Sequence, residues 1–583
     1  MKNKIFEHLQ FLYGTAEANV LLPQLQSRLQ SFRQRYPSLS SDDTQQPRFS
    51  QKDVILITYG DIVQQDGQEP LQVQRRFLKE NVGDIISTIH LLPFFPYSSD
   101  DGFSVIDYQK VAPELGSWND VHKLGKNFRL MFDAVINHIS AESNWFKGYL
   151  GGDSKYKDYF FEVSPDFDTS QVFRPRALPI LTAFQTATGK KRVWTTFSQD
   201  QIDLNYRSPE LLLEIIDILL LYVANGADFI RLDAVAFLWK ESGTNCVHLP
   251  QTHHIIQLIR AVLDVIAPRV SIITETNVPH QENISYFGDG YNEAQMVYNF
   301  ALPPLTLQAF HSGSAETLSK WAATLTTPSN QTAFFNFLAS HDGIGLMPVR
   351  GYLSEEEVTF MVNRIKALGG YVSYKNNSDG SQTAYEMNIN YLDSLGDPES
   401  PDEDTTLTAQ RFLASQAIML ALRGVPGIYF HSLLGSRSWK PGVEQTGRYR
   451  TINRQKLQYS RLTQELSDSN SLRLLVLNGF KRLLKIRRSN LAFHPQGGQQ
   501  ILAIHPAVFA LLRTSPNGEF HVLCLHNVAN RVVELSIDLK KLPMTSVNSL
   551  KDILNNREIH AINSQLSLKL APYQVSWLQA NSI

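Results

Sequence analysis

The sequence predicts an α/β fold, a (β/α)8 TIM barrel with an inserted domain after strand 3 and a C-terminal all-β domain. Three observations support this prediction. Eight short runs rich in β-branched and aromatic residues alternate with helical segments, the interval after the third run is long, and the pattern changes near the end of the chain. Most of the runs are continuously apolar, as expected of parallel strands covered on both faces.

The predicted barrel extends over residues 51–490 and contains the eight runs as its strands. In chain order the runs are residues 53–60, 84–94, 128–137, 227–235, 270–277, 294–302, 332–340 and 425–430. Residues 139–205 are rich in aromatic residues and interrupted by Gly and Pro, which indicates an inserted small domain. Residues 343–405 are polar, and long loops inside a compact fold usually have a function.

The two ends of the sequence differ from the barrel. Residues 1–50 have the pattern of a helical extension, with about two amphipathic helices and a polar, Pro-containing linker. Residues 491–583 contain short alternating segments such as FHVLCLHNV (520–528), which predict a β-domain.

The composition excludes several classes of protein. With 583 residues, of which 43% are hydrophobic and 19% charged, the chain can build a large core. A formal net charge of −2 provides no field for nucleic acid or an anionic membrane, and no run of about 18 apolar residues could span a bilayer. The two cysteines, Cys246 and Cys524, give neither a disulfide framework nor a metal-binding spacing. Because the N-terminus also lacks a secretory pattern, we expect a cytoplasmic protein without nucleic-acid or membrane partners.

Polar side chains gather where the predicted strands end, which is the face of such a barrel that carries function. In chain order they are Tyr59, Asp61, His90, Asp133, Asn137, His138, Arg231, Asp233, Glu275, His341 and Asp342. Structure alone would explain one or two ionisable residues at such positions. Here most strand ends have at least one, so the set predicts a single site.

Three carboxylates around one pocket indicate glycosidic chemistry. Asp233, Glu275 and Asp342 could divide the roles of nucleophile, proton donor and stabiliser of an oxocarbenium-like transition state. A metal site is the rival interpretation, since Asp, Glu and His also bind cations. No paired motif such as His-Glu-x-x-His supports a metal, and we predict none.

Four segments carry a family resemblance. DAVINHIS (133–140), FIRLDAVAF (229–237), ITETN (273–277) and LASHDGIG (338–345) resemble the four signature regions of the α-amylase superfamily, glycoside hydrolase family 13, over roughly residues 50–480. The resemblance implies a nucleophile, an acid/base and a transition-state stabiliser. In that order they are Asp233, Glu275 and Asp342. It also implies sugar-binding roles for His90, His138 and His341, and an orienting role for Arg231.

The resemblance and simple electrostatics together predict two different carboxyl groups. We expect Arg231 to keep Asp233 ionised, because a nearby cation lowers a carboxyl pKa and a nucleophile must be charged. Glu275 should have a raised pKa, so that it can donate a proton.

Further segments resemble the sucrose phosphorylase subfamily. They are LITYGDIV (56–63), LLPFFPYSSDDGFSVIDY (91–108) and TFSQDQIDLNY (196–206). The resemblance implies a retaining phosphorylase that forms a covalent glucosyl-enzyme and releases α-glucose 1-phosphate. Phosphate would be a co-substrate, without cofactor or metal, and the other partner would be a small glucoside. Independently of the resemblance, residues 1–50 could mediate a homodimer.

The same resemblance implies an aspartate after the first strand that pairs with a late arginine and closes the glucose pocket. We assign Asp61 to the aspartate and Arg454 to the arginine, with Arg450 as second choice. Arg350 and Lys375 are candidates for binding phosphate, because an anionic acceptor needs cations. Solvated loop charges are an equally good interpretation of both.

One departure from the subfamily pattern concerns the loops of residues 343–405, which would face the acceptor. In DGSQTAYEMNINYLDSLGD (379–397), Glu386 replaces the expected Gln. This resembles phosphorylases of glucosylglycerate or glucosylglycerol, and a glycerate anion would require Lys375 or another cation to neutralise Glu386. The alternatives are a sucrose phosphorylase, an amylosucrase-like transglucosidase and a non-catalytic sugar-binding protein. The last is disfavoured, because all three carboxylates are present.

Overall fold

The protein is described from a computed structural model that covers residues 2–40, 47–176, 178–377, 381–397, 399, 404–543 and 549–580. A closed parallel barrel forms its centre, with the strand order β1-β16-β12-β11-β10-β9-β4-β3. The strands are β1 (Ile55–Thr58), β3 (Thr88–Leu91), β4 (Arg129–Ala134), β9 (Ala227–Leu232), β10 (Ser271–Thr274), β11 (Met296–Tyr298), β12 (Ala333–Phe337) and β16 (Val425–Tyr429). Each of the eight predicted runs contains one of these strands, so the predicted barrel is confirmed.

Helices surround the barrel and bury its strands on the outside. The main ones are α2 (Pro70–Val82), α3 (Trp118–Gly125), α5 (Pro209–Ala224), α6 (Pro250–Ile266), α8 (Leu302–Ser312), α9 (Glu316–Ala322), α10 (Glu355–Ala367), α12 (Thr405–Ala421) and α16 (Leu472–Ser489). The start of α5 shows why the sequence folds in this way: Ser208 caps the helix by accepting a hydrogen bond from the Leu211 amide, and Pro209 occupies its first turn.

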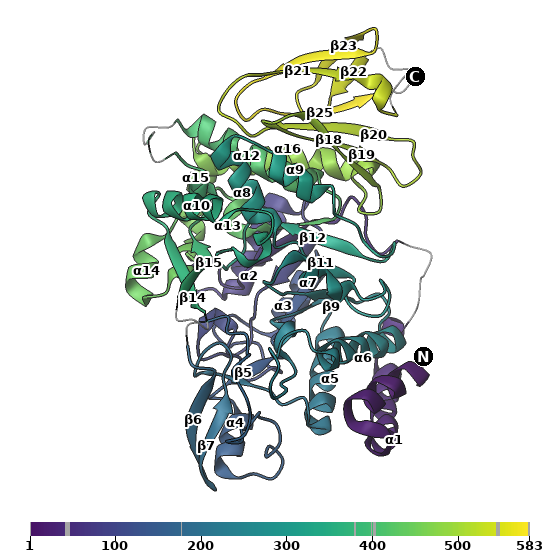
Figure 1. Cartoon of the computed structure of the whole chain (residues 1–583), viewed down its shortest axis with the longest axis vertical. Coiled ribbons are helices and arrows are strands. Elements are labelled where there is room, and N and C mark those ends of the chain that lie inside the picture. The colour runs from purple at the N-terminus through teal and green to yellow at the C-terminus, as the bar shows by residue number, and fades with distance from the viewer. Residues whose placement is uncertain are drawn as a thin grey trace.

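Two long excursions stand at the C-terminal mouth of the barrel. The first follows β4 and contains β5 (His138–Ser140), α4 (Asn144–Gly151), β6 (Leu181–Thr186), β7 (Gly189–Trp194) and β8 (Gln201–Asp203). It has a small apolar core of its own around Phe161 and Trp194 and projects from the lower end of the molecule (Figure 1). The second follows β12 and forms a sheet of β13 (Ile344–Gly345), β14 (Tyr371–Asn376) and β15 (Gln382–Asn388).

Helix α1 (Lys2–Arg35) lies against α5 and α6 (Figure 1). It is kinked at Gly14, where φ is 80°, so it consists of two helical pieces. Leu9, Leu21 and Leu25 are buried on the docked face. The hydroxyl of Tyr13 donates a hydrogen bond of 2.9 Å to the carbonyl of Tyr206.

The C-terminal β-domain is one antiparallel sheet at the upper end of the molecule (Figure 1). Its strands are β18 (Gly498–His505), β19 (Val508–Thr514), β20 (His521–Asn527), β21 (Val533–Asp538), β22 (Ser549–Asp552), β23 (Arg557–Ile562), β24 (Gln565–Leu570) and β25 (Val575–Ala580). The predicted all-β domain is thereby confirmed. Within the described residues, no helix has the length and apolar character needed to cross a membrane.

Candidate active site

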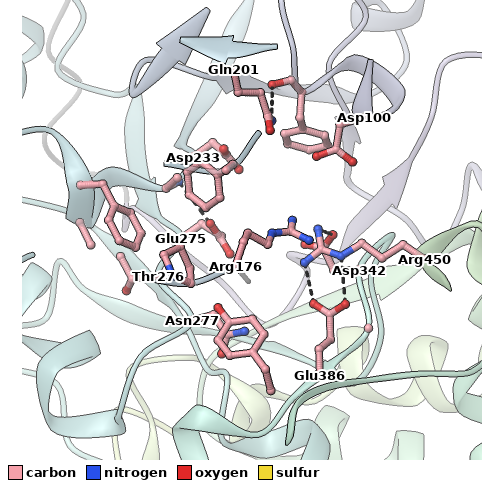
Figure 2. A pocket seen from close by; sticks show the side chains of 18 of the residues that line it. Asp100, Arg176, Gln201, Asp233, Glu275, Thr276, Asn277, Asp342, Glu386 and Arg450 are labelled. Atoms are coloured by element: carbon pink, nitrogen blue, oxygen red, sulfur yellow. Dashed lines mark hydrogen bonds and ion pairs between the residues drawn. The ribbon is translucent and has the colours of Figure 1, made fainter. Parts of the chain in front are cut away.

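A pocket opens at the C-terminal ends of the barrel strands, and the three predicted carboxylates lie in its wall (Figure 2). Asp233 follows β9, Glu275 follows β10 and Asp342 follows β12. Other residues of the wall are Asp100, Phe103, His138, Arg176, Phe197, Gln201, Asn277, Phe300, His341, Tyr385, Glu386 and Arg450. The predicted gathering of strand-end residues in one pocket is therefore observed for the carboxylates, His138 and His341.

Arg231 connects the carboxylates from beneath the pocket. Its guanidinium contacts Asp133, lies 2.9 Å from Oδ1 of Asp233 and 3.8 Å from Oε2 of Glu275. The sheet produces this arrangement, because Asp133 on β4 and Arg231 on β9 are register partners. His90 also lies behind the pocket wall, where Nε2 is 2.7 Å from Asp133, so it supports Arg231 instead of lining the pocket.

The pKa shift of Glu275 has the expected direction, whereas that of Asp233 does not. Burial raises the pKa of Asp233 above its ordinary value, and Arg231 only opposes this shift. The expectation of a lowered pKa was wrong, because Arg231 is shared with Asp133 and Glu275 and does not offset the burial of Asp233. Burial, with the charges of Asp233 and Asp342, raises the pKa of Glu275 to about 7, in the predicted direction.

Asp342 is the carboxylate that stays ionised most strongly. Burial would raise its pKa, but the charges of Arg450, His341, Arg454 and Arg231 together outweigh burial and hold the pKa below the usual range, with Arg450 the largest contributor. Nη1 of Arg450 is 2.5 Å from Oδ1 of Asp342, and His341 is 3.5 Å from the same oxygen. The ring of His341 stacks on Phe103 with a centroid distance of 4.7 Å, which fixes its orientation.

Arg450 also binds Glu386 with two hydrogen bonds, from Nε to Oε1 at 3.0 Å and from Nη2 to Oε2 at 2.6 Å (Figure 2). The cation that neutralises Glu386 is therefore Arg450, and not Lys375. Gly343 makes this approach of β15 possible, because a Cβ there would lie 2.6 Å from the Cγ of Glu386.

The predicted pairing of Asp61 with Arg454 or Arg450 is wrong. Arg454 binds Asp101 at 2.5 Å and lies 3.6 Å from Asp100. Both aspartates adopt left-handed backbone conformations, with φ of 49° and 54°, in a tight loop after β3 whose Asp100 and Phe103 line the pocket. Asp61 instead contacts Lys456 at 2.5 Å.

The sheet explains where Asp61 lies. The short strands β2 (Val63–Gln64) and β17 (Leu457–Gln458) pair in parallel, which brings the residues just before them together outside the pocket. Lys375 and Arg350 also lie outside it, in a neighbouring groove. The structure therefore does not bring Asp61, Lys375 or Arg350 to the carboxylates.

Arg176 is the most consequential residue that the sequence reasoning missed. It comes from the inserted domain, and its side chain extends into the pocket (Figure 2). Within the described part of the chain, no hydrogen bond or ion pair involves its guanidinium. The only signal in the sequence was the basic spacing of FRPR (173–176) in a long loop.

A buried lysine lies where the third-strand motif ends. Nζ of Lys240 is 2.7 Å from Asp203 and 3.5 Å from Oδ1 of Asn137, and all three side chains are buried. Among the residues that the structure describes, no group of three or more His, Cys, Asp or Glu side chains is arranged to hold a metal ion.

The chain is similar to a known protein family, to several characterised enzymes and to solved structures. Residues 81–364 match the family model of the α-amylase catalytic domain. A glucosylglycerate phosphorylase from Spirochaeta thermophila is 47% identical over 99% of this chain and 98% of its own length. A sucrose phosphorylase from Streptococcus mutans is 29% identical over 82% of this chain and 97% of its own. The crystal structure of sucrose 6F-phosphate phosphorylase from Thermoanaerobacter thermosaccharolyticum superposes with a TM-score of 0.72 at 22% identity, over 88% of this chain and 98% of that one.

Proposed function

This chain belongs to the α-amylase superfamily, among its glucoside phosphorylases, and we propose that it transfers the glucosyl group of glucosylglycerate to phosphate. The products would be α-glucose 1-phosphate and glycerate. Full-length similarity to a glucosylglycerate phosphorylase supports this substrate. The observation in the site that favours it is Arg176, whose guanidinium reaches the pocket without a hydrogen bond or ion pair to a described residue, although its charge helps to lower the pKa of the Asp100 carboxyl.

The first half-reaction cleaves the glucoside. A carboxylate oxygen of Asp233 attacks the anomeric carbon while the bond from that carbon to the glycerate oxygen breaks. Glu275 gives its proton to the departing oxygen, and its pKa of about 7 leaves a useful protonated fraction near neutrality. Asp342, held ionised by Arg450, stabilises the positive charge that develops on the sugar.

The second half-reaction returns the enzyme to its starting state. Hydrogen phosphate gives its proton to the Glu275 carboxylate, and one of its oxygens attacks the anomeric carbon of the glucosyl-enzyme. The bond to Asp233 breaks, which releases α-glucose 1-phosphate with retained configuration. In this proposal phosphate is a co-substrate, and no cofactor takes part.

The charges around the acceptor suit two anionic partners, glycerate and phosphate. Glu386 would repel both if it stood alone, but its bidentate contact with Arg450 offsets that charge. Arg176 then contributes a cation that can bind a carboxylate or a phosphate through paired N–H groups. Fructose, which takes the place of glycerate in sucrose, carries no charge that could pair with Arg176.

A product assay tests this function. The protein is incubated with glucosylglycerate, glucosylglycerol or sucrose, each with and without phosphate, and α-glucose 1-phosphate and free glucose are quantified. We expect phosphate-dependent α-glucose 1-phosphate, formed fastest from glucosylglycerate. Faster release from sucrose would make the chain a sucrose phosphorylase. Glucan or glucose formed from sucrose without phosphate would indicate an amylosucrase-like enzyme, and binding without turnover would indicate a sugar-binding protein.

A further inference from the structure

A second cavity, which we call the side groove, adjoins the active-site pocket. It encloses about 840 Å³ between the inserted domain and the sheet of β13, β14 and β15. Val278 lines both cavities. The loop of residues 174–176 separates them, because Arg174 faces the side groove while Pro175 and Arg176 face the pocket.

Three cations converge on the side groove from separate parts of the chain. Arg174 belongs to the inserted domain, Arg350 follows the 3-10 helix Met347–Val349, and Lys375 lies on β14. No described residue forms an ion pair with any of the three. The carboxylate that lines the groove, Glu282, lies 3.2 Å from His248.

The local environment of Lys375 makes this cluster more than a set of solvated charges. Lys375 is half-buried, and its ammonium lies 5.3 Å from the centroid of the Phe173 ring. Burial, followed by the like charge of Arg350, lowers its pKa. Lys375 and Arg350 carry like charges that repel, and an anion bound near both would remove that repulsion.

We propose that Arg174, Arg350 and Lys375 form a second anion site, which binds a phosphate group beside the active-site pocket. Arginine offers a planar pair of donors that matches a phosphate, and lysine adds a point charge. The groove is large enough for inorganic phosphate or for a sugar phosphate. Binding itself does not depend on the reaction proposed above, whereas a role in holding phosphate next to the pocket rests on it.

Calorimetric titration tests the site directly. Inorganic phosphate and α-glucose 1-phosphate are titrated separately into the Asp233→Asn protein, which prevents turnover. The same titrations are done with Arg350→Gln/Lys375→Gln added, and with a matched control, Arg531→Gln/Lys551→Gln, which removes the same charges from the C-terminal domain. A further protein carries Arg176→Gln, which removes the cation of the pocket. We expect the groove double variant to weaken one phosphate-binding step by about tenfold or more while Arg176→Gln leaves that step intact.

The two ligands show whether the side groove takes free phosphate or the phosphate group of a sugar phosphate. The ligand that binds more tightly at the side groove is the one that the site recognises. Added salt should weaken this step, because exposed charges are screened. Isotherms that coincide for the groove variant and its control would overturn the proposal, as would loss of all phosphate binding on Arg176→Gln alone. The product assay decides the reaction separately, so either proposal can fail without the other.

Discussion

Replacing Arg450 by Gln should damage both stability and catalysis, because this side chain neutralises two carboxylates at once. It makes three charge-assisted contacts of 2.5, 2.6 and 3.0 Å, one with Asp342 and two with Glu386. Glu386 is 2% exposed and cannot regain these interactions from water. Removing one partner of a buried ion pair typically costs about 3–5 kcal/mol.

The effect on catalysis follows from the same contacts. Arg450 is the main cation that lowers the pKa of Asp342, so this pKa should rise in Arg450→Gln. Asp342 would then become protonated at a higher pH, and the acidic limb of the kcat/KM profile should move towards neutrality. If about 2.7 kcal/mol of the lost interaction acts in the transition state, kcat/KM falls about 100-fold at pH 7.

The stability change has a defined pH dependence. A carboxyl group whose folded pKa is depressed stabilises the fold above its unfolded pKa, and this stabilisation disappears as pH falls through the folded value. Arg450→Gln should therefore lose most stability at neutral pH and least in acid. Urea unfolding across pH, with the exposed Arg448→Gln as control, measures this difference. An Arg450→Gln protein with the stability and pH profile of Arg448→Gln would refute the reasoning.

Three further predictions concern single residues. Asp233→Asn should lose transfer of the glucosyl group by a factor of about 10³ or more while still binding glucoside in calorimetry; retained turnover would exclude its role as nucleophile. Because burial raises the pKa of Glu275 to about 7, the rate of glucosyl-enzyme formation should fall as pH rises through 7, and Glu275→Gln should abolish that limb of the profile measured by rapid quench. Arg454→Gln should lower kcat/KM at least tenfold more than Asp61→Asn, because Arg454 holds the Asp101 loop beside the pocket. Equal effects of the two variants would support the pairing of Asp61 with Arg454, which the structure contradicts.

The barrel and the three carboxylates could be predicted because their signals are local. Each strand is a short apolar run, and each of Asp233, Glu275 and Asp342 stands within a few residues of a strand end. Contacts between long loops could not be predicted in this way. Arg454 and Asp101 are 353 residues apart in sequence, and their contact depends on two left-handed residues in a tight loop.

The sequence predicted the direction of the pKa shift for one of the two central carboxyl groups. For Glu275, burial and the charges of Asp233 and Asp342 outweigh the opposing charge of Arg231, so its pKa is raised, as its role requires. For Asp233, burial and Arg231 act in opposite directions, and the result depends on how many carboxylates share that arginine. The sequence places Arg231 beside Asp233, but only the packed barrel reveals the competing contact with Asp133.

The docking of α1 has a consequence for biosynthesis. Its buried face meets residues that are synthesised much later, since Arg28 contacts Asp217 and His8 contacts His254, 189 and 246 residues further along the chain. At roughly 5–20 residues per second, the ribosome needs about 10–50 s to make the surfaces that cover it. Until then the apolar stripe of α1 remains exposed on the nascent polypeptide. This stripe is therefore the earliest site on the chain for a holding chaperone to bind.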